Sequence, residues 1–177
     1  MYYLGAVKRL ISDPLLYVTL SLLIFVPGAN LAVIGYLVNL AGVDGPEAPF
    51  GNFRKRFVTG AQTVAVMVVY LMLPAVVYNF YSLQATLLTL LFMFPFLAHS
   101  LVRLGMGTCL EEVLELENLL RAYSPRFLVE LFKAMLFTLL TFVVMLVVPL
   151  LGWIGILYGP LAIFMSLMGQ AYQDHFV

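Results

Sequence analysis

The sequence predicts a single-domain, all-α integral membrane protein built from two full transmembrane helical hairpins. An N-terminal interfacial helix precedes them, followed by a short hydrophobic segment broken at a Pro-Gly pair. The composition is the first observation behind this prediction. Of 177 residues, 63% are hydrophobic and 10% are charged, and the mean hydropathy is +1.04. Soluble domains are about 45–50% apolar and about 25% charged, so a bilayer is the solvent that suits this chain.

The placement of the charges is the second observation. The nine basic and nine acidic residues fall in four short regions, at 8–13, 44–56, 103–133 and position 174. The intervening stretches 14–43, 57–102 and 134–173 carry no charge. Because a spanning helix needs about 20 apolar residues, 57–102 and 134–173 each have room for a hairpin. The formal net charge of zero gives no indication of nucleic-acid binding.

The first 43 residues contain two predicted elements. Residues 1–13 combine an apolar helical face with Lys8 and Arg9, which is typical of a helix on the membrane surface. Asp13 followed by proline predicts an N-cap and a new helix. Pro27 and Gly28 then interrupt the apolar segment 14–43. Two structures fit this segment: a single kinked span, or a short re-entrant hairpin whose arms enter and leave on one side.

The rest of the chain is interpreted from similar signals. Residues 44–52 form a turn-rich loop that includes Pro49, and Asn52 is predicted to cap the helix that enters the first hairpin. Pro74 is predicted to kink that helix. The region 103–133 is predicted to be cytoplasmic and amphipathic, with a polar helix over 105–123. Ser124 before a proline predicts another capped helix start.

Positive charges near the span ends predict the topology. Arg54, Lys55, Arg56 and Arg103 flank the first hairpin, and further cations precede the second. Positive charge marks the cytoplasmic side, so the polar loops and the C-terminus are predicted to be cytoplasmic, in a multipass protein of the cytoplasmic membrane. We favour the re-entrant hairpin for 14–43, because it places all charges on one side. A single crossing would put the N-terminal cations outside.

No motif with catalytic spacing is present, such as HExxH, GxSxG or a phosphate-binding glycine loop. No Asp or Glu lies within a predicted span, which weakens the case for an ion-coupled carrier. Cys109 is the single cysteine, which excludes an internal disulfide and a cysteine-based zinc site. We therefore expect a protein that is not an enzyme and that has no cofactor or metal.

The candidate binding residues lie at the helix break and at the span ends: Asn30, Tyr36, Arg54, Lys55, Arg56, His99 and Arg103. Asn30 is predicted to satisfy backbone groups freed by the break, with a ligand contact as the alternative. His99 is predicted to bond to the backbone or to Ser100, with a cytoplasmic gate or a headgroup contact as the alternative. The cluster Arg54–Arg56 is chiefly an orientation signal, and anionic-lipid binding is its natural second role. Gly155 and Gly159, in GxxxG spacing, favour close helix packing within the chain over dimerisation.

Several motif residues resemble those of a known family. They are Pro27, Gly28, Asn30, Gly35-Tyr36-Leu37, Pro49-Phe50, Arg56-Phe57, Gly60, Tyr70 and Pro74. This pattern resembles the uncharacterised domain of unknown function 4013 family of prokaryotic, often archaeal, multipass membrane proteins. The likeness is best over residues 5–80, and the loop 44–52 has fewer acidic and Trp residues than is usual in that family. The resemblance implies a multipass membrane protein and brings no known catalytic residues.

The sequence leaves two main functional hypotheses. The first is a non-enzymatic scaffold or subunit of a membrane assembly, which contacts membrane lipids and associates with itself or with another membrane protein. The second is a passive channel or carrier for a small solute or lipid, because proline-broken helices often line membrane sites. A membrane enzyme is the least favoured class.

Overall fold

The computed structural model describes residues 13–42, 50–115, 117, 120–147, 155 and 158–176. These residues form helices and connecting turns, with no strand among them. Three helices are long and apolar enough to cross a membrane: α4 (Phe53–Phe80), α5 (Leu83–Gly105) and α8 (Pro125–Val147). The prediction of an all-helical chain with helices of spanning length is therefore confirmed. Residues 1–12 of the predicted interfacial helix, and Pro49 in the predicted loop, lie outside the described residues.

The helices begin where the capping signals predict. Asp13, Asn52 and Ser124 each accept a hydrogen bond from a backbone N–H of the following first turn, at 3.0, 3.0 and 3.3 Å. They precede α2 (Pro14–Leu23), α4 and α8. Each bond satisfies a donor that the first helical turn leaves unpaired. The three predicted caps are confirmed.

The Pro27-Gly28 pair separates two short helices. α2 ends at Leu23, and α3 (Ala29–Asn39) begins directly after Gly28, whose φ of 84° suits glycine. The two helices have 10 and 11 residues, or roughly 15 and 17 Å, against a bilayer core of roughly 30 Å. Neither helix alone is long enough to cross, and the predicted break is confirmed.

α3 and the following turn η1 (Leu40–Gly42) form the centre of the molecule. Every residue from Gly35 to Ala41 is buried, on all sides of the helix. Three other helices approach this segment at glycines where a Cβ atom would collide with backbone. The pairs are Gly60 of α4 with Leu31, Gly105 of α5 with Val38, and Gly169 of α10 (Tyr158–Phe176) with Ala41. Small residues permit such close approach between helices in membranes.

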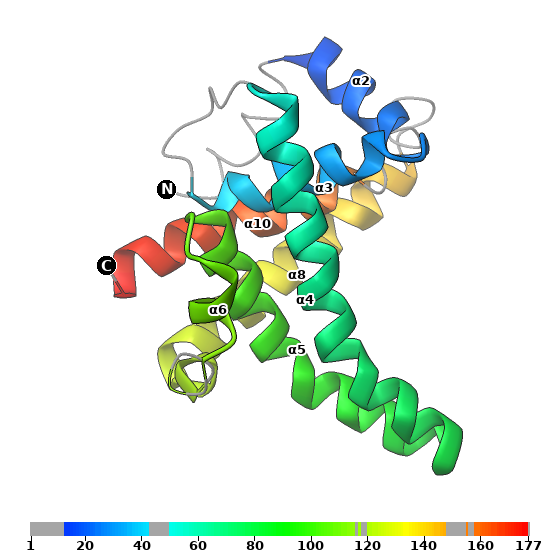
Figure 1. Ribbon diagram of the computed structural model, residues 1–177, viewed down its shortest axis with the longest axis vertical. Coiled ribbons are helices and arrows are strands. Elements are labelled where there is room, and N and C mark those ends of the chain that lie inside the picture. The colour runs from blue at the N-terminus through cyan, green and yellow to red at the C-terminus, as the bar shows by residue number, and fades with distance from the viewer. Residues whose placement is uncertain are drawn as a thin grey trace.

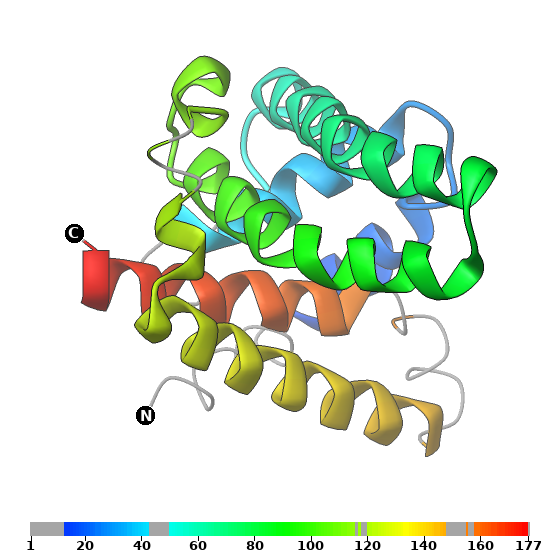
Figure 2. The ribbon, with the colours of Figure 1, turned by 90° about the horizontal axis from the view of Figure 1, so that it is seen from below.

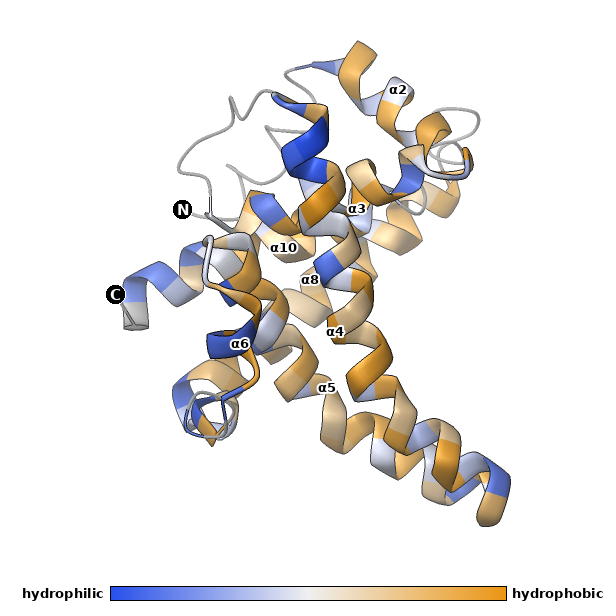
Figure 3. Ribbon diagram, viewed as in Figure 1, coloured by the Kyte–Doolittle hydropathy of each residue, from blue (hydrophilic) through white to orange (hydrophobic). Residues whose placement is uncertain are grey.

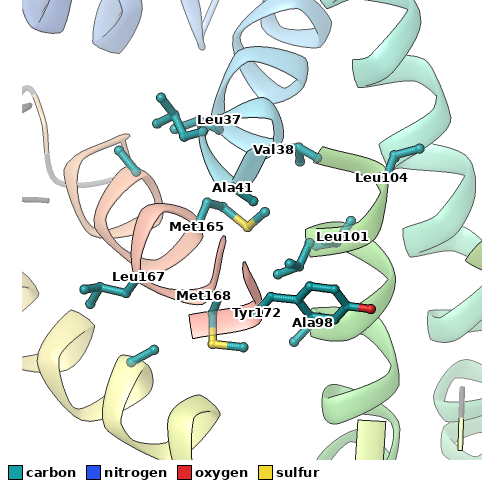
Figure 4. Close-up of a cluster of buried hydrophobic side chains, with 14 of the residues drawn as sticks. Leu37, Val38, Ala41, Ala98, Leu101, Leu104, Met165, Leu167, Met168 and Tyr172 are labelled. Carbon is teal, nitrogen blue, oxygen red and sulfur yellow. The ribbon is translucent and has the colours of Figure 1, made fainter. Parts of the chain in front are cut away.

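Apolar side chains complete this central contact. Figure 4 shows side chains of α3, α5 and α10 meeting, among them Leu37, Leu101 and Met165. Met168 and Val102 are fully buried on the same two outer helices. The core of the molecule therefore lies where α3 is enclosed by its neighbours.

The helices α4 and α5 form an antiparallel hairpin that extends away from this core (Figure 1). We call residues 71–92 of this hairpin the arm. Its large side chains are widely exposed, with Met72, Leu88 and Leu91 at 60%, 69% and 70%. Pro74 lies inside α4 and is itself buried. Figure 3 shows an arm that is mostly apolar along its length and hydrophilic at its tip, and none of its residues is charged.

The second pair, α8 and α10, runs side by side, with α5 on the other side of α10 (Figure 2). In Figure 1 this pair crosses the direction of the arm. α10 differs from the three spanning candidates because much of it is buried, including Tyr158, Ile163 and Met168. Gly155 faces Tyr17 of α2, and Gly159 faces Met145 of α8.

The region 103–133 differs from the predicted polar helix over 105–123. α5 continues to Gly105, and Gly107 then adopts a φ of 90°, which stops a helix. Between 108 and 123, the described residues form the short α6 (Leu110–Val113) and the 3₁₀ turn η2 (Arg121–Tyr123), with Glu117 and Leu120 also helical and Glu115 outside a helix. The prediction of one continuous helix here was wrong, because the left-handed conformation of Gly107 separates α5 from α6 and the chain leaves the helical conformation again at Glu115.

Candidate functional site

Five of the motif residues that carry the family resemblance meet at the crossing of α3 and α4: Gly35, Tyr36, Phe50, Arg56 and Gly60. Arg56 donates from Nε to the Phe50 carbonyl at 3.0 Å, and its guanidinium lies 5.4 Å from the centre of the Tyr36 ring. The rings of Tyr36 and Phe50 are 5.5 Å apart. Gly35 packs against the Arg56 carbonyl and the Gly60 nitrogen. This arrangement fixes the helix crossing through a cation–π contact and close backbone packing.

Arg54 and Lys55 lie on the exposed first turn of α4 and do not join this cluster. Asn30 is half-buried at the start of α3, and its backbone N–H donates to the Val26 carbonyl at 3.0 Å, across the break. Arg103 lies in the last turn of α5 and donates from Nη1 to the Glu112 carbonyl at 3.3 Å. The predicted binding residues therefore occupy separate places, with Tyr36 and Arg56 as the pair in contact.

His99 is fully buried and neither of its ring nitrogens has a hydrogen-bond partner among the described residues. Its ring packs edge-on against Phe127 of α8 and Tyr172 of α10, with centroids 5.2 and 5.4 Å apart. Ser100 instead shares a hydrogen bond of 2.9 Å with Tyr70 of α4. The predicted bond from His99 to Ser100 is absent, and complete burial keeps the ring away from a lipid headgroup.

An apolar groove of about 640 Å³ lies between the α4–α5 hairpin and the α8–α10 pair. Its floor is the core contact of Figure 4, with Leu37, Ala98 and Met165 among the lining residues. The exposed side chains of Phe132, Leu136 and Leu139 form part of its α8 wall. The groove therefore opens sideways along α8, a helix apolar enough to face lipid chains.

Thr138 is the single polar residue among the described residues that line the groove. Its Oγ1 is buried and has no hydrogen-bond partner in this part of the chain. Other helical threonines donate to the carbonyl four residues earlier, as Thr63 and Thr141 do at 2.8 and 2.9 Å. Because this oxygen is buried within the protein, the surface of the groove is almost wholly apolar, which suits a largely apolar ligand.

Sequence reasoning did not find this groove. Its lining comes from five helices, and the position of those helices depends on the glycine contacts around α3. A threonine within an apolar span carries no distinctive signal, because most such hydroxyls bond to their own helix.

Comparison with protein-family models, with curated proteins and with solved structures found no match to this chain. The geometry of its own residues is therefore the basis for any functional proposal.

Proposed function

We propose that this protein is a non-enzymatic multipass protein of the cytoplasmic membrane that serves as a subunit or scaffold of a membrane assembly. Membership of the domain of unknown function 4013 family, whose motifs this chain resembles, is part of this proposal. The observation that carries it is the arm, a two-helix hairpin that reaches beyond the rest of the described molecule (Figure 1) and whose large apolar side chains are exposed. Such a surface packs on another membrane helix through van der Waals contact rather than through the hydrophobic effect.

The proposed topology has support from the contacts of α3. Gly35 packs on Arg56 at the start of α4, and Gly42 packs on Gly105 at the end of α5. Because α4 and α5 are antiparallel, the first turn of α4 and the last turn of α5 lie at the same end of the hairpin. α3 thus lies across that end rather than along the hairpin, which favours a re-entrant path for residues 14–43 over a full crossing.

The distribution of charge agrees with this topology. Figure 3 shows strongly hydrophilic residues at the start of α4, along α6 and η2, and at the end of α10, while the hydrophilic tip of the arm contains no charged residue. The exposed Glu111, Glu112, Glu115 and Glu117 belong to this side. We propose that this side faces the cytoplasm and that the aromatic tip of the arm, with Tyr78 and Tyr81, lies at the outer interface.

Cysteine crosslinking in native membranes tests the assembly proposal. In a Cys109→Ser background, Leu88→Cys places a thiol on the arm and Leu140→Cys places one on α8, at parent exposures of 69% and 58%. We expect covalent products with a thiol-reactive crosslinker from the arm position and none from the control. A protein that is monomeric in detergent and gives no product from Leu88→Cys would contradict the proposal.

The groove favours a second candidate function, a passive carrier for a lipid or a small apolar solute. A laterally open apolar groove gives such a molecule a place within the protein. Lipid scrambling and solute flux in proteoliposomes test this candidate. Rates equal to those of empty vesicles would rule it out.

A further inference from the structure

We propose that the end of α5 that meets η2 and α6 binds a phospholipid headgroup carrying a phosphate and a primary ammonium, as phosphatidylethanolamine does. Arg103 and Arg121 hold the phosphate, and Glu111 accepts hydrogen bonds from the ammonium. This site does not depend on the assembly role, because one copy of the chain supplies all three side chains.

The turn η2 packs on α5 and carries Arg121. The Tyr123 hydroxyl donates to the Phe92 carbonyl, and the ring centroids of Tyr123 and Phe96 are 4.9 Å apart. Ala122 is fully buried, whereas Arg121 is exposed. The turn is thus fixed against α5, while the Arg121 side chain stays accessible to a ligand.

Arg103 faces the same region from α5. It follows His99 by about one helical turn and is half-buried, so the two residues lie on one face of the helix. The His99 ring packs against the Tyr172 ring of α10, with centroids 5.4 Å apart. The charges of both Arg103 and Arg121 act electrostatically on these two rings. Two guanidinium groups from separate elements therefore lie close to one pair of buried rings.

Neither arginine has a carboxylate partner in the part of the chain that the structure describes, where the salt bridge joins Lys133 to Glu130. Arg103 donates from Nη1 to the Glu112 carbonyl at 3.3 Å, which leaves the other N–H donors of its guanidinium for a ligand. Two like charges that converge repel each other, and an anion between them removes this repulsion. The planar guanidinium matches phosphate oxygens in pairs, so a phosphate group suits this position.

The length of α5 brings this region to the surface of a bilayer. The helix has 23 residues, or roughly 35 Å, against a bilayer core of roughly 30 Å. With the tip of the arm at one surface, the last turn of α5 reaches the headgroups of the opposite leaflet. Leu88, Leu91 and Phe92, at 69%, 70% and 55% exposure, offer acyl chains an apolar surface on the same helix. A lipid uses both features, whereas a soluble phosphate compound uses only the arginines.

Carboxylates next to the arginines favour one kind of headgroup. The bond from Arg103 to the Glu112 carbonyl holds α6 beside the last turn of α5, and the exposed Glu111 lies in the first turn of α6. Figure 3 shows the strongly hydrophilic α6 at this place. A purely anionic headgroup would be repelled by Glu111, whereas a primary ammonium offers it a positive charge and N–H donors. The choline group has the charge without such donors, so ethanolamine is the better match.

Competitive lipid retention tests the headgroup. Protein is reconstituted in equimolar dioleoyl phosphatidylethanolamine, phosphatidylcholine and phosphatidylglycerol and re-extracted in mild detergent, and the retained lipids are quantified by mass spectrometry. We expect the wild type to retain phosphatidylethanolamine roughly two- to fivefold over each other lipid, the range that an exposed ion pair supports. Glu111→Gln should make retention of phosphatidylethanolamine and phosphatidylcholine equal. Equal retention of all three lipids by the wild type, or a preference for phosphatidylglycerol, would overturn the proposal.

Two matched arginine variants test the phosphate contact. Arg121→Gln removes the exposed guanidinium of η2, and Arg54→Gln removes an exposed guanidinium at the start of α4. We expect Arg121→Gln to lower the retained phosphatidylethanolamine roughly two- to fivefold and Arg54→Gln to retain it as the wild type does. Equal retention by the two variants would place the lipid elsewhere and overturn the site.

Delipidated protein distinguishes a lipid from a soluble phosphate compound. We expect inorganic phosphate to leave the midpoint of unfolding in SDS at the value found with chloride of equal ionic strength. A midpoint that phosphate raises in the wild type but not in Arg121→Gln would assign the site to soluble phosphate and overturn the lipid proposal.

Discussion

The glycine contacts between α3 and α4 predict a result opposite to that expected from helix propensity. In an exposed helix, replacing glycine by alanine stabilises by roughly 0.5–1 kcal/mol. At Gly60, the new Cβ would collide with the Leu31 carbonyl, and at Gly35 it would collide with the Arg56 carbonyl. These obstacles are backbone atoms and cannot move aside by a rotamer change. The helices must separate, so packing opposes propensity at both positions.

The magnitude is the balance of these opposing effects. Overpacking a well-packed interior costs roughly 1–3 kcal/mol. Offset by the propensity gain of roughly 0.5–1 kcal/mol, Gly35→Ala and Gly60→Ala should each lower the free energy of unfolding, by up to about 2.5 kcal/mol. Because both glycines lie at one crossing, the helix separation forced by the first substitution reduces the cost of the second. The double variant should therefore lose less than the sum of the single losses.

Unfolding by SDS in mixed micelles, followed by circular dichroism, measures these differences. Ala61→Leu on the exposed side of α4 is the control, and its unfolding free energy should change by no more than about 0.5 kcal/mol. Alanine variants at Gly35 and Gly60 that are as stable as the wild type, or more stable, would refute the close contact. Strict additivity in the double variant would refute a shared crossing.

Three further predictions concern side-chain contacts. Arg56→Lys keeps the charge but loses the hydrogen bond from Nε to the Phe50 carbonyl, so the free energy of unfolding should fall by about 0.5–1.5 kcal/mol. Arg54→Lys is the control and should have no effect, and equal effects of the two substitutions would contradict the contact. A double-mutant cycle of Tyr70→Phe and Ser100→Ala should give a coupling of about 0.6 kcal/mol, and zero coupling would exclude their hydrogen bond. His99→Leu should leave the free energy of unfolding in SDS unchanged or raise it, because the buried ring nitrogens have no partner in the described protein. A fall of more than about 2 kcal/mol in that free energy would indicate a hydrogen-bond partner for the ring.

Local signals in the sequence identify the helix starts and the break well. Asp13, Asn52 and Ser124 cap the helices that they are predicted to cap, because capping depends on residues only two or three positions apart. The break at Pro27-Gly28 likewise arises from the backbone chemistry of two residues. The left-handed conformation of Gly107 was not predicted, because glycine adopts left-handed and right-handed conformations with similar ease.

Long-range contacts were harder to predict. The sequence singles out Gly35, Tyr36, Phe50 and Arg56 as motif residues, but their meeting at one crossing depends on the path of α3. The groove depends on the angle between two helix pairs, and no periodicity encodes that angle. His99 was expected to find a polar partner, whereas aromatic rings of two distant helices enclose it.

The central claim is that residues 14–43 enter and leave the membrane on the cytoplasmic side, while the tip of the arm reaches the outer side. Single cysteines at Asp13, Asn52 and Tyr81, in a Cys109→Ser background, test it directly by labelling with a membrane-impermeant maleimide. All three parent residues are exposed in the structure. In intact cells, Tyr81→Cys should react, and Asp13→Cys and Asn52→Cys should react only after the membrane is permeabilised. Labelling of Asp13→Cys from outside, with Asn52→Cys protected, would show a single crossing and contradict this topology.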